Sequence, residues 1–176
     1  MADVTREDLR RFCQGMPVGI FDGLEDEQLD AIAAITQRET FDDQQVIIED
    51  GSDGDTMYLL LSGKVRVTKK LFFRSGRTIA QGEREIIELP AEWNPYFGEL
   101  ALFDAASIRT ATVAGSEAGE YGVINNADFY ALAEGDHDIG YVVLKNVLMK
   151  AVGTIRSGNQ NVINLTTALS FSLTSR

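Results

Sequence analysis

The chain has 176 residues, of which 44% are hydrophobic and 24% charged, so it is long enough for one domain that buries a core without disulfide bonds. Its formal net charge of −11 at pH 7 disfavours binding to nucleic acids and to anionic membranes, which both attract clustered lysines and arginines. With one cysteine, no signal-type N-terminus and no apolar run of membrane-spanning length, we expect a cytoplasmic protein without DNA or membrane partners.

Two helices are expected in the N-terminal part of the chain, over residues 5–36. In the first, over residues 5–20, Leu9 and Phe12 belong to an apolar stripe with steps of three and four residues. The second covers residues 25–36 and has acidic residues in its first turn, where they stabilise a helix start. Both helices should place one apolar face on the rest of the domain.

The hydrophobic period then changes to about 2, which is typical of strands. Short segments rich in β-branched and aromatic residues alternate with glycine-containing turns, one of them at Gly63, and this spacing favours an antiparallel sheet. We therefore predict a mainly β protein, an antiparallel jelly-roll-like β-roll (double-stranded β-helix) over residues 39–124, with an extended hairpin loop over residues 71–82. The expected strands are residues 40–41, 46–49, 56–61, 64–70, 84–89, 110–114 and 120–124.

Helices return over residues 126–157, which complete a predicted domain of residues 1–157. The longer one starts near His137, where Asp136 and Asp138 can cap it. Its apolar residues are expected to face inward: Tyr141, Leu144, Val147, Leu148, Ala151, Val152 and Ile155.

The last segment, residues 158–176, has two possible structures. Leu148, Ile155, Val162 and Leu169 recur every seven residues, which favours a continued helix that pairs with a second copy in a homodimer. Two glycines and three asparagines between residues 153 and 164 weaken helix propensity and favour a frayed tail instead.

The segment Phe97-Gly98-Glu99-Leu100-Ala101-Leu102-Phe103 and the later Arg109-Thr110-Ala111 have the chemistry of an anion site. Gly98 allows a tight turn close to a ligand, and a short helix after it offers unpaired N–H donors. The Arg109 guanidinium can bind a phosphate with two parallel hydrogen bonds. Glu99 would repel that phosphate unless it accepts a hydrogen bond from a hydroxyl, so a phosphate joined to a ribose satisfies both residues. The alternative is an ordinary turn before a helix, with Glu99 stabilising the helix start and Arg109 on the surface.

These two motifs resemble the phosphate-binding cassette of the cyclic-nucleotide-binding domain family, and residues 49–67 resemble its Gly-Asp turn and the strand pair after it. The resemblance implies that Arg109 binds the cyclic phosphate of cAMP or cGMP and that Glu99 accepts from the ribose 2′-hydroxyl. It also implies that the N–H groups of Gly98, Leu100 and Ala101 surround the phosphate, and that Thr110 contacts a phosphate oxygen or a guanine amino group. No cofactor is expected.

The rim of the predicted pocket differs from the family pattern, because Glu92-Trp93-Asn94-Pro95-Tyr96 stands where the family often has Gly-Asp. Trp93 or Tyr96 either stacks on a base or packs on the roll. In the family, a C-terminal helix closes over the base and transmits occupancy. Candidates for a contact with the purine edge in such a helix are Asn159, Asn161 and Thr166.

No enzyme signature is found in the sequence. His137 is the single histidine and lacks a neighbouring nucleophile motif, and the acidic loop Asp50–Asp55 lacks the EF-hand pattern, so we expect a solvated turn there. Only twenty residues follow Arg156, too few for a helix-turn-helix domain. Two functions remain: a cyclic-nucleotide sensor that signals through its C-terminal helix to a protein partner or a second copy, or a dimer scaffold that keeps the roll and binds no nucleotide.

Overall fold

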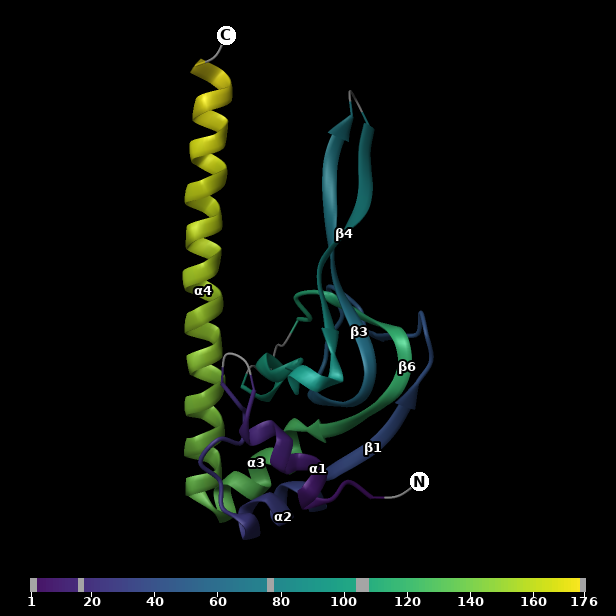
Figure 1. Ribbon diagram of the computed structural model, residues 1–176, viewed down its shortest axis with the longest axis vertical. Coiled ribbons are helices and arrows are strands. Elements are labelled where there is room, and N and C mark those ends of the chain that lie inside the picture. The colour runs from purple at the N-terminus through teal and green to yellow at the C-terminus, as the bar shows by residue number, and fades with distance from the viewer. Residues whose placement is uncertain (1–2, 16–17, 76–77, 104–107, 175–176) are drawn as a thin grey trace.

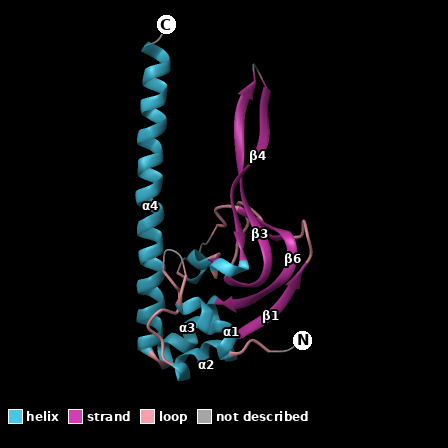
Figure 2. Ribbon diagram, in the orientation of Figure 1, coloured by secondary structure: helices cyan, strands magenta, loops and turns pink. Residues whose placement is uncertain are grey.

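The computed structural model describes residues 3–15, 18–75, 78–103 and 108–174. Within them a six-stranded antiparallel sheet curls into a roll, with short helices at one end and one long helix along its side (Figures 1 and 2). The predicted mainly β class with flanking helices is confirmed. The strands lie in the order β1 (Thr36–Phe41), β6 (Thr112–Asn125), β3 (Thr56–Ser75) and β4 (Thr78–Pro90), while β2 (Val46–Ile48) pairs with β6 and β5 (Tyr96–Phe97) with β3.

Strand β3 is one continuous element, whereas the sequence predicted two strands separated by a turn at Gly63. The glycine has a φ of +78°, and the pairing of β3 with β6 shifts register around it. A Cβ atom there would lie 2.6 Å from the carbonyl oxygen of Ala118 on β6. Gly63 therefore allows a bulge inside a strand that continues. The two strands expected over residues 110–124 likewise form the single strand β6.

The segment expected as a hairpin loop, residues 71–82, is itself paired. Strands β3 and β4 form an antiparallel ladder that reaches Ser75 and Thr78, and residues 76–77 lie outside the described part of the chain. Figure 1 shows this hairpin extending well beyond the roll, in the same direction as the long helix. We call the distal part, residues 68–75 and 78–85, the hairpin arm.

The first predicted helix is shorter than residues 5–20. It consists of α1 (Arg6–Arg10) and a 3₁₀ turn, η1 (Arg11–Cys13), while residues 16–17 lie outside the described part. The chain folds back because the Phe21 N–H donates to the Phe12 carbonyl at 3.1 Å and Gly19 lies against the Cys13 backbone, where a Cβ atom would have no room. The second helix, α2 (Asp26–Ala34), lies where it was predicted.

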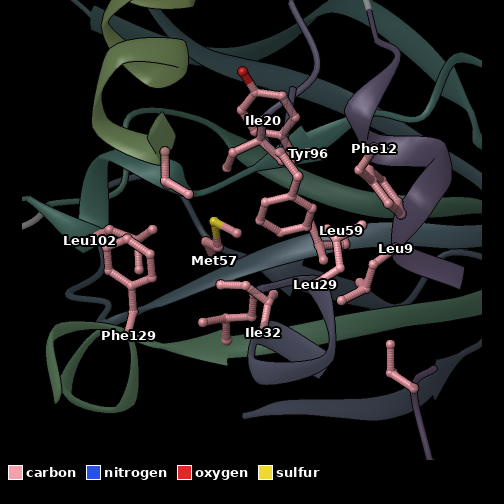
Figure 3. Packing of buried hydrophobic residues seen from close by; sticks show 14 of the residues in the cluster. Leu9, Phe12, Ile20, Leu29, Ile32, Met57, Leu59, Tyr96, Leu102 and Phe129 are labelled. Atoms are coloured by element: carbon pink, nitrogen blue, oxygen red, sulfur yellow. The ribbon is translucent and has the colours of Figure 1, made fainter. Parts of the chain in front are cut away.

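The main core lies between the roll and the helices at its end. It collects side chains from α1, η1, α2, β3, β5, α3 (Asn126–Gly135) and the first turns of α4 (His137–Thr174), as Figure 3 shows. Burial of large side chains from elements far apart in sequence fixes the helices on the sheet. The labelled residues are Leu9, Phe12, Ile20, Leu29, Ile32, Met57, Leu59, Tyr96, Leu102 and Phe129.

Helix α4 is continuous over 38 residues and reaches Thr174, within the segment for which the sequence left a helix and a frayed tail open. Its start is capped as predicted, since the Asp136 carboxylate accepts from the N–H groups of Asp138 and Ile139 at 3.0 and 3.4 Å. None of the described helices has the length and apolar character needed to cross a membrane.

The predicted inward face of α4 is correct at Val147 and wrong at most of the other positions. The buried residues are Ile139, Val143, Asn146 and Val147, and Ala151 is half-buried. Asn146 belongs to this face because its side-chain amide donates to the carbonyls of Ile20 and Asp22 at 3.1 and 2.9 Å. Five residues expected inside are exposed instead: Tyr141, Leu144, Leu148, Val152 and Ile155.

Candidate ligand-binding site

A cavity of about 400 Å³ lies between the short helix η3 (Glu99–Leu102), the residues before β6 and the side of α4. Its volume is within the usual range for small-molecule sites. All six residues predicted for the site line it, so the structure brings them together. The lining consists of Gly98, Glu99, Leu100, Ala101, Ile108, Arg109, Thr110, Ala151, Thr154 and Ile155.

Gly98 lies in the tight turn predicted for it and has a left-handed backbone, with a φ of +73°. A Cβ atom at this position would lie 2.6 Å from Arg109 Nη1 and 3.1 Å from the Thr56 carbonyl oxygen. A side chain here would therefore push the guanidinium away. The glycine thus sets both the turn into η3 and the close approach of Arg109 to the backbone.

The short helix predicted over residues 100–103 is the 3₁₀ helix η3, which begins at Glu99. The Ala101 N–H donates to the Gly98 carbonyl at 3.1 Å, so this donor is already used inside the turn. The first N–H groups of a helix have no partner within it, and here they belong to Glu99 and Leu100. These two groups are better placed than that of Ala101 to meet an anion.

Arg109 is 7% exposed and is the one charged residue that is buried in the part of the chain that the structure describes. Its Nη2 donates to Thr56 Oγ1 at 3.0 Å, and its Nη1 to the Gly98 carbonyl at 3.3 Å. Its Cζ lies 5.9 Å from the ring centroid of Tyr58, within cation–π distance. A guanidinium has five N–H donors, so these contacts hold it while leaving donors for a ligand.

The charge of Arg109 is maintained in this environment. Burial lowers the pKa of the guanidinium, while Tyr58 and Asp55 nearby raise it. Because the ordinary pKa of arginine is so high, the side chain stays cationic at neutral pH. A buried, permanently charged donor at a cavity wall attracts anions.

The acidic loop Asp50–Asp55 does more than form the expected solvated turn. The Arg109 N–H donates to the Ser52 carbonyl and the Gly51 N–H to the Arg109 carbonyl, both at 2.8 Å. Gly54 lies directly against the guanidinium, where a Cβ atom would be 2.0 Å from Arg109 Nε. The loop therefore positions Arg109 from behind.

Asp50 is bound rather than free in this loop. Its carboxylate lies 2.8 Å from Lys69 Nζ, and this contact lowers the pKa of Asp50. The same ammonium donates to the Thr110 carbonyl at 2.6 Å, which ties the base of the hairpin arm to the cavity. In the part of the chain that the structure describes, no three His, Cys, Asp or Glu side chains are placed to hold a metal ion.

Glu99 pairs with a cation that the sequence analysis did not include. Its Oε1 lies 2.9 Å from Nζ of Lys150 on α4, and both side chains are mostly buried. The Lys150 ammonium also donates to the Tyr96 carbonyl at 2.8 Å. Helix α4 is thus joined by an ion pair to the segment that carries the predicted site.

Several sequence candidates for base contacts lie elsewhere. Tyr96 is buried in the main core, so its packing alternative is the correct one, and Trp93 in η2 (Ala91–Trp93) is exposed and does not line the cavity. The α4 residues at the cavity are Ala151, Thr154 and Ile155, about one turn or more before Asn159, Asn161 and Thr166. Of these three, Asn161 lines a groove between α4 and the hairpin arm.

The residues that hold the site together were not predicted from the sequence. Thr56 and Tyr58 lie two residues apart on β3, so a strand period of 2 places them on one face beside Arg109. That signal was available in the sequence. Lys150 had no local signal, because its partner lies 51 residues earlier in the chain.

Comparisons with known proteins identify the family and the fold of the chain. The sequence model of the family described as "Cyclic nucleotide-binding domain" matches residues 38–136. The CRP-like cAMP-activated global transcriptional regulator of Mycobacterium tuberculosis is 29% identical over 86 residues, which is 49% of this chain and 34% of the relative. The cGMP-dependent protein kinase egl-4 of Caenorhabditis briggsae is 29% identical over 97 residues, 54% of this chain and 12% of the kinase.

A solved structure shows the same fold. It is a cyclic nucleotide-binding domain from Methylobacillus flagellatus, with a TM-score of 0.72 and 19% identity over 90% of this chain and 82% of that one. The curated relatives are longer, and the chain spans about one third or less of their length.

Proposed function

Because the chain belongs to the cyclic nucleotide-binding domain family, we propose that it is a regulatory module that binds cAMP or cGMP in the cavity between η3 and α4. The observation that carries this proposal is the buried Arg109 guanidinium on the cavity wall, in the same lining as Glu99. Burying a charge is costly unless it is compensated. A phosphate in the cavity supplies that compensation.

In this proposal Arg109 and the first N–H groups of η3 bind the cyclic phosphate. Glu99 accepts a hydrogen bond from the ribose 2′-hydroxyl. Thr110, which is exposed at the same cavity, contacts a phosphate oxygen or the base, and Thr154 and Ile155 of α4 face the rest of the nucleotide. The proposal assigns no catalytic step to this site. Binding of the nucleotide acts by changing the conformation of the protein.

Helix α4 is the element through which we propose that binding is transmitted. It contributes to the cavity wall and then continues past the roll (Figure 1). A ligand shifts a conformational equilibrium only by its different affinity for the two states. If α4 moves between the two states, the nucleotide contacts it differently in each and therefore binds the two states with different affinity.

We propose a second copy of this chain as the partner of α4. Leu148, Ile155 and Val162 recur at seven-residue steps and are all exposed, as a seam between two parallel helices requires. Residues 157–175 contain no charged residue, although the chain as a whole carries a net charge of −11. Two copies that approach along this segment avoid the repulsion that their other surfaces would cause.

Isothermal titration with cAMP and with cGMP, on protein freed of ligand by unfolding and refolding, tests the binding. We expect saturable binding of at least one nucleotide, weakened at least about tenfold by Arg109→Ala because charge-assisted hydrogen bonds to the phosphate are lost. Arg109→Lys keeps the charge but cannot form the bidentate pair of hydrogen bonds with the phosphate, so it should also weaken binding.

Arg84→Ala on the hairpin arm is the matched control, since it removes one exposed arginine from the same acidic chain. It should leave the affinity unchanged. Folded wild-type protein that gives no heat with either nucleotide overturns the proposal, as does equal binding by wild type and Arg109→Ala.

The exposed apolar face of α4 also favours a second candidate function, a dimer scaffold that binds no nucleotide. Thermal unfolding separates the two, because a ligand that binds only the folded state raises the melting temperature. Under the scaffold hypothesis, light scattering should give a dimer mass while neither nucleotide raises the melting temperature. Under the sensor hypothesis the nucleotide raises it in the wild type and not in Arg109→Ala.

A further inference from the structure

Lys150 is a mostly buried cation on α4 that is held from three sides. Its Nζ lies 2.9 Å from Glu99 Oε1, donates to the Tyr96 carbonyl at 2.8 Å, and lies 3.7 Å from the centroid of the Tyr96 ring. Such a position costs side-chain entropy and removes water from the ammonium. The contacts offset these costs in free energy only if the Glu99 carboxylate keeps its position beside the ammonium.

Lys150 compensates the charge of Glu99 and leaves the three charged groups at the cavity with a net positive charge. Arg109 and Lys150 each carry one positive charge, and Glu99 carries one negative charge, so these three groups together have one net positive charge. Among the described residues, Glu99 forms its ion pair with Lys150 and not with Arg109. Arg109 therefore keeps its charge available for an anion, and a phosphodiester with one negative charge neutralises the site.

Without Lys150, the Glu99 carboxylate would face an incoming phosphate uncompensated. Two like charges at short distance in a partly buried site repel strongly, because protein and ligand exclude water between them. Glu99 could then only lower the affinity for the anion. The ammonium removes this penalty and leaves Glu99 free to contribute a hydrogen bond.

The pairing also leaves part of the carboxylate available. A carboxylate has two oxygens that each accept hydrogen bonds. The ion pair with Lys150 uses Oε1. The Lys150 contact therefore holds the carboxylate at one oxygen, and the second oxygen can still accept a hydrogen bond from a ligand hydroxyl.

We infer that Lys150 is the positioning residue that gives this pocket its preference for anions with a neighbouring hydroxyl, and that it does so by holding and neutralising Glu99 from α4. This inference rests on the proposed function, since the hydroxyl in question is the ribose 2′-hydroxyl of the nucleotide. It adds a regulatory consequence. A displacement of α4 moves Lys150 and thereby changes how Glu99 accepts the ligand.

The test compares cAMP with 2′-deoxy-cAMP by isothermal titration, with cGMP and its 2′-deoxy form used if the wild type binds only cGMP. The wild type should bind the hydroxyl-bearing nucleotide about tenfold more tightly, the value of one hydrogen bond to a charged group. In Lys150→Met the affinity for cAMP should fall about tenfold, and the preference over the 2′-deoxy form should shrink to about twofold or less. Lys145→Met, on an exposed face of the same helix, is the control and should change neither value.

A second variant separates positioning from simple loss of structure. In Glu99→Gln there is no carboxylate to compensate, so adding Lys150→Met should weaken cAMP binding far less than it does in the wild-type background. This non-additivity is the readout that a purely structural lysine would not produce. Melting temperatures of all variants identify any that fail to fold.

Each result has a definite meaning. If Lys150→Met weakens cAMP and 2′-deoxy-cAMP equally, and does so to the same extent in the Glu99→Gln background, the inference is wrong while Arg109-dependent binding leaves the proposed function standing. If Lys150→Met keeps the wild-type preference for cAMP over 2′-deoxy-cAMP, the inference is likewise wrong and the proposed function stands. Wild-type protein that binds no cyclic nucleotide overturns both.

Discussion

Gly54 offers a selective way to displace the arginine of the site. A Cβ atom at this position would lie 2.0 Å from Arg109 Nε and 2.3 Å from Cζ, and its three nearest neighbours all belong to the Arg109 side chain. The backbone of Gly54 is outside the positive-φ region, so alanine is conformationally allowed. Gly54→Ala should therefore move the guanidinium and leave the loop in place.

The cost follows from the contacts that the guanidinium loses. Its hydrogen bonds to Thr56 Oγ1 and the Gly98 carbonyl contribute about 1 kcal/mol each in net terms. Replacing glycine by alanine stabilises the folded state by about 0.4–1 kcal/mol, because it lowers the conformational entropy of the unfolded chain. We expect the free energy of unfolding to fall by about 1–1.5 kcal/mol. Cyclic-nucleotide affinity should fall at least about tenfold, since a displaced guanidinium cannot bind the phosphate with its two-pronged geometry.

Urea denaturation and isothermal titration measure the two effects, and a double-mutant cycle gives the decisive comparison. In the Arg109→Ala background the space beside residue 54 is empty, so Gly54→Ala should no longer destabilise the protein. Gly135→Ala, where an added Cβ meets nothing within 4 Å, is the control for the effect on the unfolded chain. Equal destabilisation by Gly54→Ala with and without the arginine side chain would refute the reasoning.

Three further predictions concern the fold and can be measured by urea denaturation. Asn146→Ala should destabilise the protein by about 2 kcal/mol, because the buried carbonyl of Ile20 and the partly buried carbonyl of Asp22 lose their donor. Gly63→Ala should cost about 2 kcal/mol or more, since its φ of +78° disfavours a side chain and the β6 backbone lies against it. For Asp8, burial raises the pKa but hydrogen bonds from Thr5 and the nearby Arg38 outweigh it, and the Lys69 contact lowers the pKa of Asp50. Both carboxyls therefore stabilise the fold fully above their unfolded pKa of about 3.9, and this stability should be lost as the pH falls through the folded values. Lys69→Met should make that acid-induced decline shallower, and a decline of unchanged steepness would contradict the assignment to Asp50.

The sequence predicted those parts of the fold that depend on local patterns. The change of period after residue 36 identified the roll, and the turn at Gly98 followed by a short helix identified the cavity wall. Gly63 was ambiguous for a physical reason, because a glycine between two strand-like segments fits a turn and a bulge equally well. Its surroundings decide between the two, and in this fold the Ala118 carbonyl of a distant strand lies against it.

Contacts between distant segments explain what the sequence could not predict. The inward face of α4 includes Asn146 and Lys150, two polar residues that an apolar stripe excludes. Each lies there because its partner is supplied by a segment at least 50 residues earlier, at Ile20 for the first and Glu99 for the second. Hydrophobic periodicity contains no information about such partners, so the predicted face was rotated away from the true one.

The inward face of α4 was also difficult to predict because the helix has apolar residues on more than one side. Over its first turns the helix has apolar residues on two sides: Ile139, Val143 and Val147 are buried in the main core, while Tyr141 and Leu148 are exposed. A helix that is hydrophobic all round is usually buried all round. The main core covers one side, and under the proposed homodimer a second copy covers the other. Lys150 lies on the covered side and Leu148 on the exposed one. Ile155, the next residue of the proposed seam, is exposed at the mouth of the cavity. Under the proposed homodimer, we expect a nucleotide that changes the Lys150–Glu99 contact to change how the two copies pair along α4.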